Sequence, residues 1–359
     1  MRVLISGGGT GGHLFPAIAV AQALSRKDPD ATILFAGRRE GIEAKTVASY
    51  GMPFTAIPAA PLYTEQVWRN WKLPPVLGAA LWQSWRLLDR FKPDVVLGTG
   101  GYVSVPLIMA AGLARVPIVL QEQNLMPGRA TRALARFAGK VATAYPESSR
   151  FLPAAKTVVT GTPVRTEFWR RKENFPHQPQ TLLVLGGSQG AHRLNQAVAD
   201  AVPWLLDRPD LRIAHQTGAR EIGAMQAVKA KLPPPLAGRY EPFAFANDLA
   251  DRIRGADLVI SRAGASTLSE VSAIGVPMIL IPYPYAGGHQ RMNVKPYESA
   301  GAAIVIPDEE AEERLRGVVT SLIDDPARYR KMVEAMRGLG RPYAAEEVVR
   351  LLEEVARHH

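Results

Sequence analysis

The sequence contains no cysteine among its 359 residues. This absence excludes disulfide bonds, zinc–thiolate sites and a thiolate nucleophile, but it leaves the cellular compartment open. The sequence also lacks lysine-rich tails and arginine blocks, so we expect no nucleic-acid partner. The net charge of +10 is nevertheless compatible with smaller anionic partners or with an acidic membrane surface.

The sequence also lacks an uninterrupted hydrophobic run of membrane-spanning length. One stretch comes close to it. The stretch from Val95 to Ala114 has no charged residue and approaches the length of a membrane-spanning helix, about 20 residues. Glycines and a proline interrupt it, at Gly98, Gly100, Gly101, Pro106 and Gly112. We therefore predict a buried strand, a glycine loop and a short helix here.

The chain contains the same pattern twice, once at the start of each half: an apolar strand, a glycine loop and a helix. MRVLISGGGTGGH runs from an apolar strand through glycines to His13, and TLLVLGGSQGAH repeats the pattern from Thr181. A glycine turn between a strand and a helix lets backbone N–H groups approach an anion, and the helix N-terminus adds a favourable dipole. Both loops therefore predict a phosphate or diphosphate ligand.

Short apolar runs that end in glycine or proline turns indicate the fold class. They read ATILFAG, DVVLGTGG and VPIVLQEQN in the first half, then ADLVISRAG and VPMILIPYP in the second. Such runs, separated by helical lengths, favour parallel strands with crossover helices. We predict an α/β protein of two doubly wound, Rossmann-like domains that face one another across a cleft. The boundary should fall between Thr160 and Gln180, where the sequence turns polar and proline-bearing.

Two common glycine-loop enzymes fit less well. Gly7, Gly9 and Gly12 satisfy G-x-G-x-x-G, but Arg38 and Arg39 stand where an NAD-binding domain has an acidic residue. An NADP-dependent oxidoreductase stays open and would leave the second glycine loop unexplained. A P-loop kinase is excluded, because neither loop reads GxxxxGK followed by Ser or Thr.

The segment SRAGASTLSEVSAIGVPMILIPYPYAGGHQRMN allows two interpretations. Thr267 and Glu270 have the spacing of a capping box, in which each would satisfy the other's helix-end N–H group. Alternatively, the Glu270 carboxylate could accept two hydrogen bonds from a vicinal diol such as a ribose. The small residues Gly264, Ala265 and Ser266 would allow a ligand to approach closely.

Several motifs occur in a fixed order along nearly the whole chain: GGGTGGH, KPDVVLGTGGYVS, EQN, TPVRTE, GGSQGAH, SRAGASTLSE and HQRMN. In this the chain resembles the MurG family of bacterial N-acetylglucosaminyltransferases, which have the two-domain GT-B fold. The resemblance implies transfer from UDP-N-acetylglucosamine to a polyprenyl-pyrophosphoryl lipid acceptor, at the cytoplasmic face of the bacterial membrane and without spanning it. It implies an acceptor- and membrane-binding domain over residues 1–163, joined by a C-terminal helix near 341–359, and a donor domain over 164–340.

The resemblance also implies the residues around the donor. Glu270 would bind the uridine ribose, the backbone near Phe245 and Ala246 the uracil, and Ser188 the diphosphate. Arg165 would reach the leaving phosphate. The phosphates and the sugar would be surrounded by Ala265, Ser266, Thr267, Leu268, Ser269, His289 and Gln290, with Thr10, Gly11, Gly12 and Asn124 from the N-terminal side. Gln121 and Thr162 depart from the residues common in the family.

The mechanism that the resemblance implies is direct displacement with inversion at the anomeric carbon. A base would remove the acceptor proton while UDP departs. His13 is the first choice for this base, with Tyr102 and Glu122 in reserve; His13 could equally orient the loop or bind acceptor phosphate. No Asp-x-Asp metal motif lies near these residues, so we expect no metal and no cofactor.

Two alternatives to a transferase stay open. A UDP-N-acetylglucosamine epimerase has a similar two-domain architecture and would need no lipid. A non-catalytic sensor would bind the sugar nucleotide without turnover.

The segment TEQVWRNWKLPPVLGAALWQSWRLLDRFKPD is rich in tryptophan. Leu77, Leu81, Trp85 and Leu88 recur at helical spacing, which is typical of one buried helix face. Basic residues flank the apolar ones, however, and tryptophan beside arginine or lysine is typical of a membrane interface. We therefore expect peripheral docking on an anionic membrane through Trp68, Arg69, Trp71, Lys72, Leu77 and Leu81.

Overall fold

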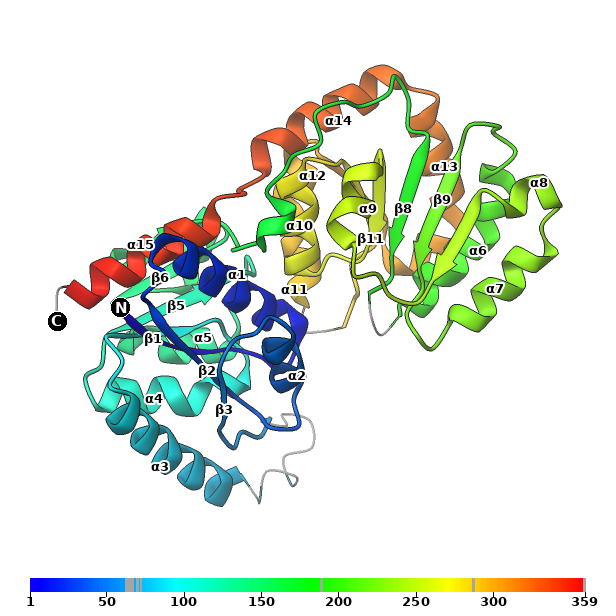
Figure 1. Ribbon diagram of the computed structural model, residues 1–359. Helices are drawn as coiled ribbons and strands as arrows, with labels where there is room; N and C mark the ends of the chain where they lie inside the picture. The colour runs from blue at the N-terminus through cyan, green and yellow to red at the C-terminus, as the bar shows by residue number, and fades with distance from the viewer. Residues whose placement is uncertain (62–67, 69–70, 72, 188–189, 286–287, 358–359) are drawn as a thin grey trace. The chain divides into compact units, whose positions relative to one another are not determined.

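The computed structural model describes residues 1–61, 68, 71, 73–187, 190–285 and 288–357. It divides into two compact units (Figure 1). Unit 1 comprises Met1–Thr166 with Arg341–His359, and unit 2 comprises Glu167–Gly340.

Unit 1 is built on a parallel sheet in the order β3-β2-β1-β4-β5-β6-β7. Its strands are β1 (Arg2–Ser6), β2 (Thr32–Gly37), β3 (Phe54–Ala56), β4 (Val95–Gly98), β5 (Ile118–Glu122), β6 (Lys140–Thr143) and β7 (Thr157–Val159). Its α-helices are α1 (Gly11–Lys27), α2 (Ile42–Ser49), α3 (Leu73–Phe91), α4 (Val105–Leu113), α5 (Arg129–Leu134) and α15 (Ala344–Arg357). Helices α1 and α15 pack together on one face, and α3 and α4 on the other (Figure 1).

Unit 2 repeats this plan with the order β10-β9-β8-β11-β12-β13, again all parallel. Its strands are β8 (Thr181–Leu185), β9 (Arg212–Gln216), β10 (Tyr240–Phe243), β11 (Leu258–Ser261), β12 (Met278–Leu280) and β13 (Ala303–Val305). Its α-helices are α6 (His192–Leu205), α7 (Ile222–Lys231), α8 (Pro234–Ala237), α9 (Leu249–Gly255), α10 (Ala265–Ile274), α11 (His289–Asn293), α12 (Lys295–Ser299), α13 (Ala311–Ile323) and α14 (Pro326–Leu339).

The predicted fold class is confirmed, because both sheets are parallel and doubly wound. The first strands of the two units, β1 and β8, lie inside their sheets. The order in which strands are added reverses beside them, between β1 and β4 and between β8 and β11. Ligands in such sheets bind beyond the carboxyl ends of the strands at this switch point. Each glycine loop follows one of these central strands, so each lies at the switch point of its own unit.

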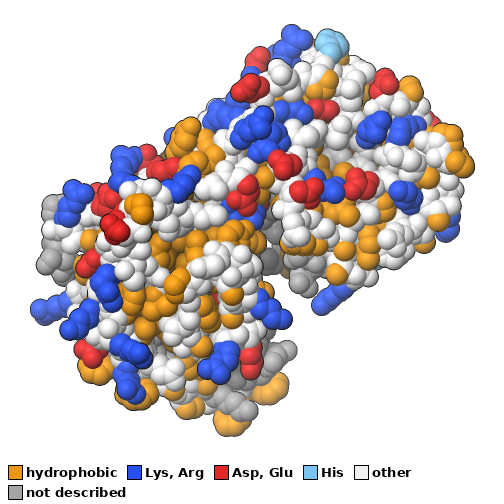
Figure 2. Space-filling view, in the orientation of Figure 1, with side chains coloured by type: hydrophobic (Ala, Val, Ile, Leu, Met, Phe, Trp, Pro, Cys, Tyr) orange, Lys and Arg blue, Asp and Glu red, His pale blue; other side chains and the backbone are white. Residues whose placement is uncertain are grey.

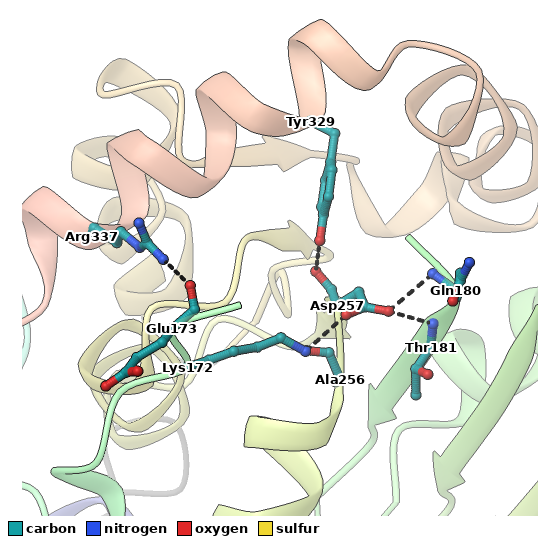
Figure 3. A network of polar contacts seen from close by, with 8 residues as sticks. All are labelled: Lys172, Glu173, Gln180, Thr181, Ala256, Asp257, Tyr329 and Arg337. Atoms are coloured by element: carbon teal, nitrogen blue, oxygen red, sulfur yellow. Dashed lines mark hydrogen bonds and ion pairs between the residues drawn. The ribbon is translucent and has the colours of Figure 1, made fainter. Parts of the chain in front are cut away.

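A buried polar network fixes the start of unit 2 (Figure 3). The Lys172 ammonium group donates to the Ala256 carbonyl at 2.9 Å and to the Asp257 carboxylate at 2.8 Å. The other carboxylate oxygen of Asp257 accepts the N–H groups of Gln180 and Thr181, at 3.0 and 2.9 Å. The side chains of Lys172 and Asp257 are 11% and 7% exposed. Their contacts attach the segment before β8 to the rest of unit 2.

Helix α3 contains the amphipathic segment, and the alternative of one buried face over Leu77, Leu81, Trp85 and Leu88 is only partly right. The buried residues of α3 are Ala80, Ser84 and Leu88, whereas the Trp85 side chain is 56% exposed. The helix, which packs on α4, therefore buries Leu88 and two small residues, and it exposes Trp82 and Trp85. Within the described residues, no helix is both long enough and apolar enough to cross a membrane. As predicted, Val95–Ala114 forms a strand, a loop and a short helix.

Candidate functional site

The first candidate site lies where β1 and β4 end side by side in unit 1. Ser6 pairs with Gly98, so the loop after each strand starts at the same edge of the sheet. Helix α1 begins at Gly11, and His13 lies in its first turn. The His13 Nδ1 atom lies 3.2 Å from the Thr99 carbonyl oxygen and 2.6 Å from the side-chain amide of Gln123. Loops after three neighbouring strands therefore meet at this imidazole.

Tyr102 belongs to the same site. The Arg38 guanidinium, at the end of β2, donates to the Tyr102 hydroxyl at 2.6 Å. A side chain at Gly9 would place its Cβ atom 3.1 Å from the Tyr102 ring, and the φ angle of Gly9 is +82°, so glycine is required there. Tyr102, predicted as an alternative to His13 as the base, thus lies against the first glycine loop.

The structure limits where this loop could bind the predicted phosphate. The Gly9 N–H group donates to the carboxylate of Glu43, a side chain that is only 1% exposed. A Cβ atom at Gly8 would collide with the same side chain. A carboxylate thus already occupies this amide, and an anionic ligand would have to bind at the first turn of α1, beside Gly11 and Gly12. Thr10 is the N-cap residue, and its side chain makes no capping hydrogen bond.

Glu122 has an organising position at the end of β5. Its carboxylate accepts the Asn124 backbone and side-chain N–H groups at 3.0 and 2.9 Å, and the Gly128 N–H group at 3.0 Å. These hydrogen bonds engage both carboxylate oxygens and fix the loop that carries Gln123 and Asn124. Because the side chain is also 1% exposed, the geometry disfavours Glu122 as the base and leaves His13 and Tyr102.

Arg165 lies in unit 1, near the end of its first segment. Its guanidinium donates to the Tyr50 hydroxyl at 2.8 Å and lies 4.4 Å from the centre of the Phe15 ring on α1. Contact between Arg165 and the donor phosphate stays a prediction.

The second candidate site lies where β8, β11 and β12 end in unit 2. Leu185, Ser261 and Leu280 are in register across these strands, so the loops that follow are neighbours. A Cβ atom at Gly186 would lie 2.8 Å from the Gln216 carbonyl oxygen, which requires glycine. Ser188, the predicted diphosphate ligand, lies outside the described residues. Helices α6 and α10 both begin at this edge, and neither N-cap residue makes a side-chain capping bond.

A buried histidine supports the second glycine loop. His215 Nε2 lies 3.0 Å from Asn195 Oδ1, and His215 Nδ1 lies 2.9 Å from the Tyr240 hydroxyl. The Asn195 amide donates to the Thr217 carbonyl and to Glu221, so its oxygen must accept from Nε2–H. Burial lowers the pKa of His215 to about 3, which keeps it neutral.

The capping-box interpretation of Thr267 and Glu270 is wrong. Helix α10 begins at Ala265 after the N-cap residue Gly264, so Thr267 is already inside the helix. Glu270 is 6% exposed, and Leu268 belongs to the core. Ser269 donates its hydroxyl to the Ala265 carbonyl at 2.9 Å, which is a bond within the helix. Ser266 and Thr267 are half-buried in the first turn.

Gln290 joins the loops after β11 and β12. Its side-chain oxygen accepts the N–H groups of Ala263 at 3.1 Å and Tyr283 at 2.9 Å. His289 begins α11 beside it and is half-buried. Further along this edge, Phe245 is 64% exposed whereas Ala246 is buried.

Sequence reasoning missed several residues of these sites. Arg262 donates to the Ile281 carbonyl at 3.1 Å and to the Asp308 carboxylate, and so fixes the edge beside Gln290. Its signal was a lone charge between an apolar strand and a run of small residues. Thr99 and Gln123 lie within the motifs KPDVVLGTGGYVS and EQN, but their contacts with His13 depend on the order of the strands. Glu43 had no local signal.

Comparison with known proteins places both units in one class. The model of the glycosyltransferase family 28 N-terminal domain matches residues 3–143, and that of the family 28 C-terminal domain matches residues 181–348. The two matches together identify the chain as a two-domain glycosyltransferase.

Relatives and solved structures narrow this class. A UDP-N-acetylglucosamine–N-acetylmuramyl-(pentapeptide) pyrophosphoryl-undecaprenol N-acetylglucosamine transferase of Desulforudis audaxviator is 38% identical over 99% of both chains. The crystal structure of MurG from Acinetobacter baumannii is 30% identical, with a TM-score of 0.78, over 98% of this chain and 99% of that one. The chain belongs to the MurG family.

The same fold also occurs in an enzyme of another kind. A UDP-N-acetylglucosamine 2-epimerase from Neisseria meningitidis, solved with UDP-N-acetylglucosamine bound, gives a TM-score of 0.70 over 99% of this chain and 100% of that one. At 15% identity this likeness shows the fold alone.

Proposed function

We propose that this chain transfers N-acetylglucosamine from UDP-N-acetylglucosamine to the 4-hydroxyl group of the muramoyl sugar of undecaprenyl-pyrophosphoryl-muramoyl-pentapeptide. The product is the disaccharide lipid used for peptidoglycan synthesis. The main support for this proposal is the 38% identity, over 99% of both chains, to a relative whose name gives an N-acetylglucosamine transferase with UDP-N-acetylglucosamine and N-acetylmuramyl-(pentapeptide) pyrophosphoryl-undecaprenol. The two switch-point sites support it, because the reaction needs one nucleotide-sugar site and one acceptor site.

Unit 2 would hold the donor. The diphosphate would lie at the first turns of α6 and α10, whose N–H groups and dipoles stabilise negative charge. Glu270 would accept hydrogen bonds from the ribose hydroxyl groups, while Gln290 and Arg262 keep the neighbouring loops in place. As the bond from the anomeric carbon to UDP breaks, its electron pair leaves with UDP, and these fixed dipoles stabilise the departing charge without reorganisation.

Unit 1 would hold the acceptor. His13 would remove the proton of the muramoyl hydroxyl group while its oxygen bonds to the anomeric carbon from the face opposite UDP. The product is therefore inverted at this carbon. Tyr102 lies against the same loop and would line the acceptor site.

The lipid acceptor requires access to a membrane, and a surface of unit 1 has suitable chemistry. Trp68, Trp71, Trp82 and Trp85 have side chains 75%, 71%, 56% and 56% exposed. Figure 2 shows hydrophobic and basic side chains mingled over α3. Leu77 and Leu81 are half-buried on this helix; Arg69 and Lys72 lie outside the described residues. This surface would dock peripherally on the anionic cytoplasmic leaflet, where each basic residue contributes about 1 kcal/mol.

A direct assay tests the proposed reaction. The protein is incubated with UDP-N-acetylglucosamine labelled in the sugar and with a short-chain analogue of the lipid acceptor. We expect label in the lipid product, and a loss of turnover in the His13→Ala variant that exceeds its loss of UDP affinity. Absence of labelled lipid with folded protein would contradict the proposal.

A further inference from the structure

Two groups contact the Nδ1 atom of His13, and their chemistry indicates whether this nitrogen carries the proton. Nδ1 lies 3.2 Å from the carbonyl oxygen of Thr99, and a carbonyl oxygen can only accept a hydrogen bond. If Nδ1 carried the lone pair, the two acceptors would face each other. The Thr99 carbonyl therefore favours a proton on Nδ1.

Gln123 makes the second contact, and its amide can present either end. The amide lies 2.6 Å from Nδ1, with its nitrogen toward the ring. In this orientation Gln123 Oε1 is buried and accepts no hydrogen bond from the described residues. The two ends of an amide have nearly the same shape, so the hydrogen bonds decide which end faces a neighbour. With its oxygen toward the ring, Gln123 would accept from Nδ1–H, as the Thr99 carbonyl does.

The surroundings hold this arrangement in place. The Gln123 side chain is 2% exposed, and the Thr99 hydroxyl donates to the backbone carbonyl of His13 at 2.7 Å. A Cβ atom at Gly100 would lie 2.9 Å from His13 Nδ1, so the loop also packs against the ring. The imidazole is therefore fixed from one side by the loops after β4 and β5.

We infer that Gln123 is a positioning residue, which together with the Thr99 carbonyl holds His13 in the Nδ1–H form and so places the basic lone pair on Nε2. The inference rests on the proposed function, in which His13 is the base. During transfer the acceptor proton moves to Nε2, and the imidazolium that forms keeps Nδ1–H bonded to the Gln123 and Thr99 oxygens. A neutral histidine with its proton on Nε2 could not accept the acceptor proton at that atom.

Two variants of Gln123 separate positioning from packing. A leucine side chain at this position cannot accept from Nδ1–H, whereas a carboxylate can only accept. We expect Gln123→Leu to lower kcat at least about 10-fold with little change in KM for the sugar nucleotide, since a general base contributes about 10²–10⁴-fold. Gln123→Glu should restore much of the loss. A wild-type kcat in Gln123→Leu, or equal losses in both variants, would overturn the inference.

A measurement that needs no turnover tests the proton position itself. Nitrogen-15 NMR of the histidine-labelled protein reports which ring nitrogen is protonated, and the His13 signals are identified from their loss in His13→Asn. We expect neutral His13 to carry its proton on Nδ1 in the wild type and in Gln123→Glu. A proton on Nε2 in the wild type would overturn the inference even if transfer occurs. Failure of the proposed function would show separately, as absence of labelled lipid.

Discussion

Among single residues, Glu270 is the side chain on which the proposed recognition of the donor most depends. It is 6% exposed and lies in the second turn of α10, whose first turn begins at the edge where the loops after β8, β11 and β12 meet. We expect Glu270→Gln to weaken UDP binding roughly 10- to 150-fold, because hydrogen bonds to a charged group contribute about 1.5–3 kcal/mol. Titration calorimetry with UDP measures this change.

The control for Glu270 is an exposed glutamate of the same unit. This residue is Glu313, in the first turn of α13. The Glu313→Gln variant should bind UDP with the affinity of the wild type. Unchanged UDP affinity in Glu270→Gln would show that the Glu270 carboxylate does not bind the ribose.

His215 gives a prediction about pH at the same scale. Its pKa is lowered to about 3 by burial, from 6.5 in the unfolded chain. Between these pH values the unfolded state binds more protons than the folded state, so stability falls as pH falls below about 6.5. From pH 7 to pH 5 this residue alone should reduce the free energy of unfolding by about 2 kcal/mol.

Urea unfolding at both pH values checks this expectation. In His215→Gln the loss between pH 7 and pH 5 should be smaller than in the wild type by about that amount. An identical loss in both proteins would show that His215 does not titrate on unfolding.

Some residues were mispredicted because their local sequence pattern does not reveal how the helix packs in the fold. Thr267 and Glu270 have capping-box spacing, yet α10 starts earlier because β11 ends at Ser261 and only a short loop follows. Trp85 has the spacing of a buried position, yet α3 buries Ala80 and Ser84 instead, since a close approach to α4 favours small residues. The partners of His13 were not predictable, because Gln123 is 110 residues away along the chain.

At the scale of elements, the glycine loop after β8 depends on a close approach of two backbone segments. A Cβ atom at Gly186 would lie 2.8 Å from the Gln216 carbonyl oxygen and 3.0 Å from Asn195 Oδ1, and neither atom can move easily. We expect Gly186→Ala to displace the loop and to weaken UDP binding at least about 10-fold, a loss of about 1.4 kcal/mol. Calorimetry with UDP again measures the effect.

Gly223 is the matched control for this loop. It lies within α7, where a Cβ atom would meet open space, so Gly223→Ala should leave UDP binding unchanged and stabilise the protein by about 0.5–1 kcal/mol. Equal UDP affinity in both alanine variants would contradict the role assigned to the Gly186 loop.

The elements themselves were largely predictable from the sequence. Strands buried on both faces read as short apolar runs, and DVVLG and ADLVIS, for example, became β4 and β11. The glycine loops then followed, since each ends a central strand. The chain alone did not reveal that Glu43 occupies the Gly9 amide, because this contact needs α2 to lie beneath the loop.

At the scale of the whole molecule, the exposed tryptophans of α3 predict binding to anionic vesicles. Trp82 and Trp85 are each 56% exposed, and the Arg86 guanidinium lies 4.9 Å from the centre of the Trp82 ring. We expect Trp82→Ser with Trp85→Ser to reduce sedimentation with anionic vesicles, and high salt to reduce it in the wild type as well. Trp204→Ser is the control, because Trp204 is 61% exposed on unit 2. Equal sedimentation of all three proteins would refute docking through α3.

If the chain is a transferase, its turnover of the sugar nucleotide requires the lipid acceptor. Proton NMR of one reaction mixture, recorded with and without the short-chain acceptor, tests it most directly by following the anomeric signal of UDP-N-acetylglucosamine. We expect this signal to be lost only when the acceptor is present, with UDP released and a new inverted, β-linked sugar signal on the lipid. Conversion of the sugar nucleotide to its 2-epimer without acceptor, or a stable signal in both mixtures, would contradict it.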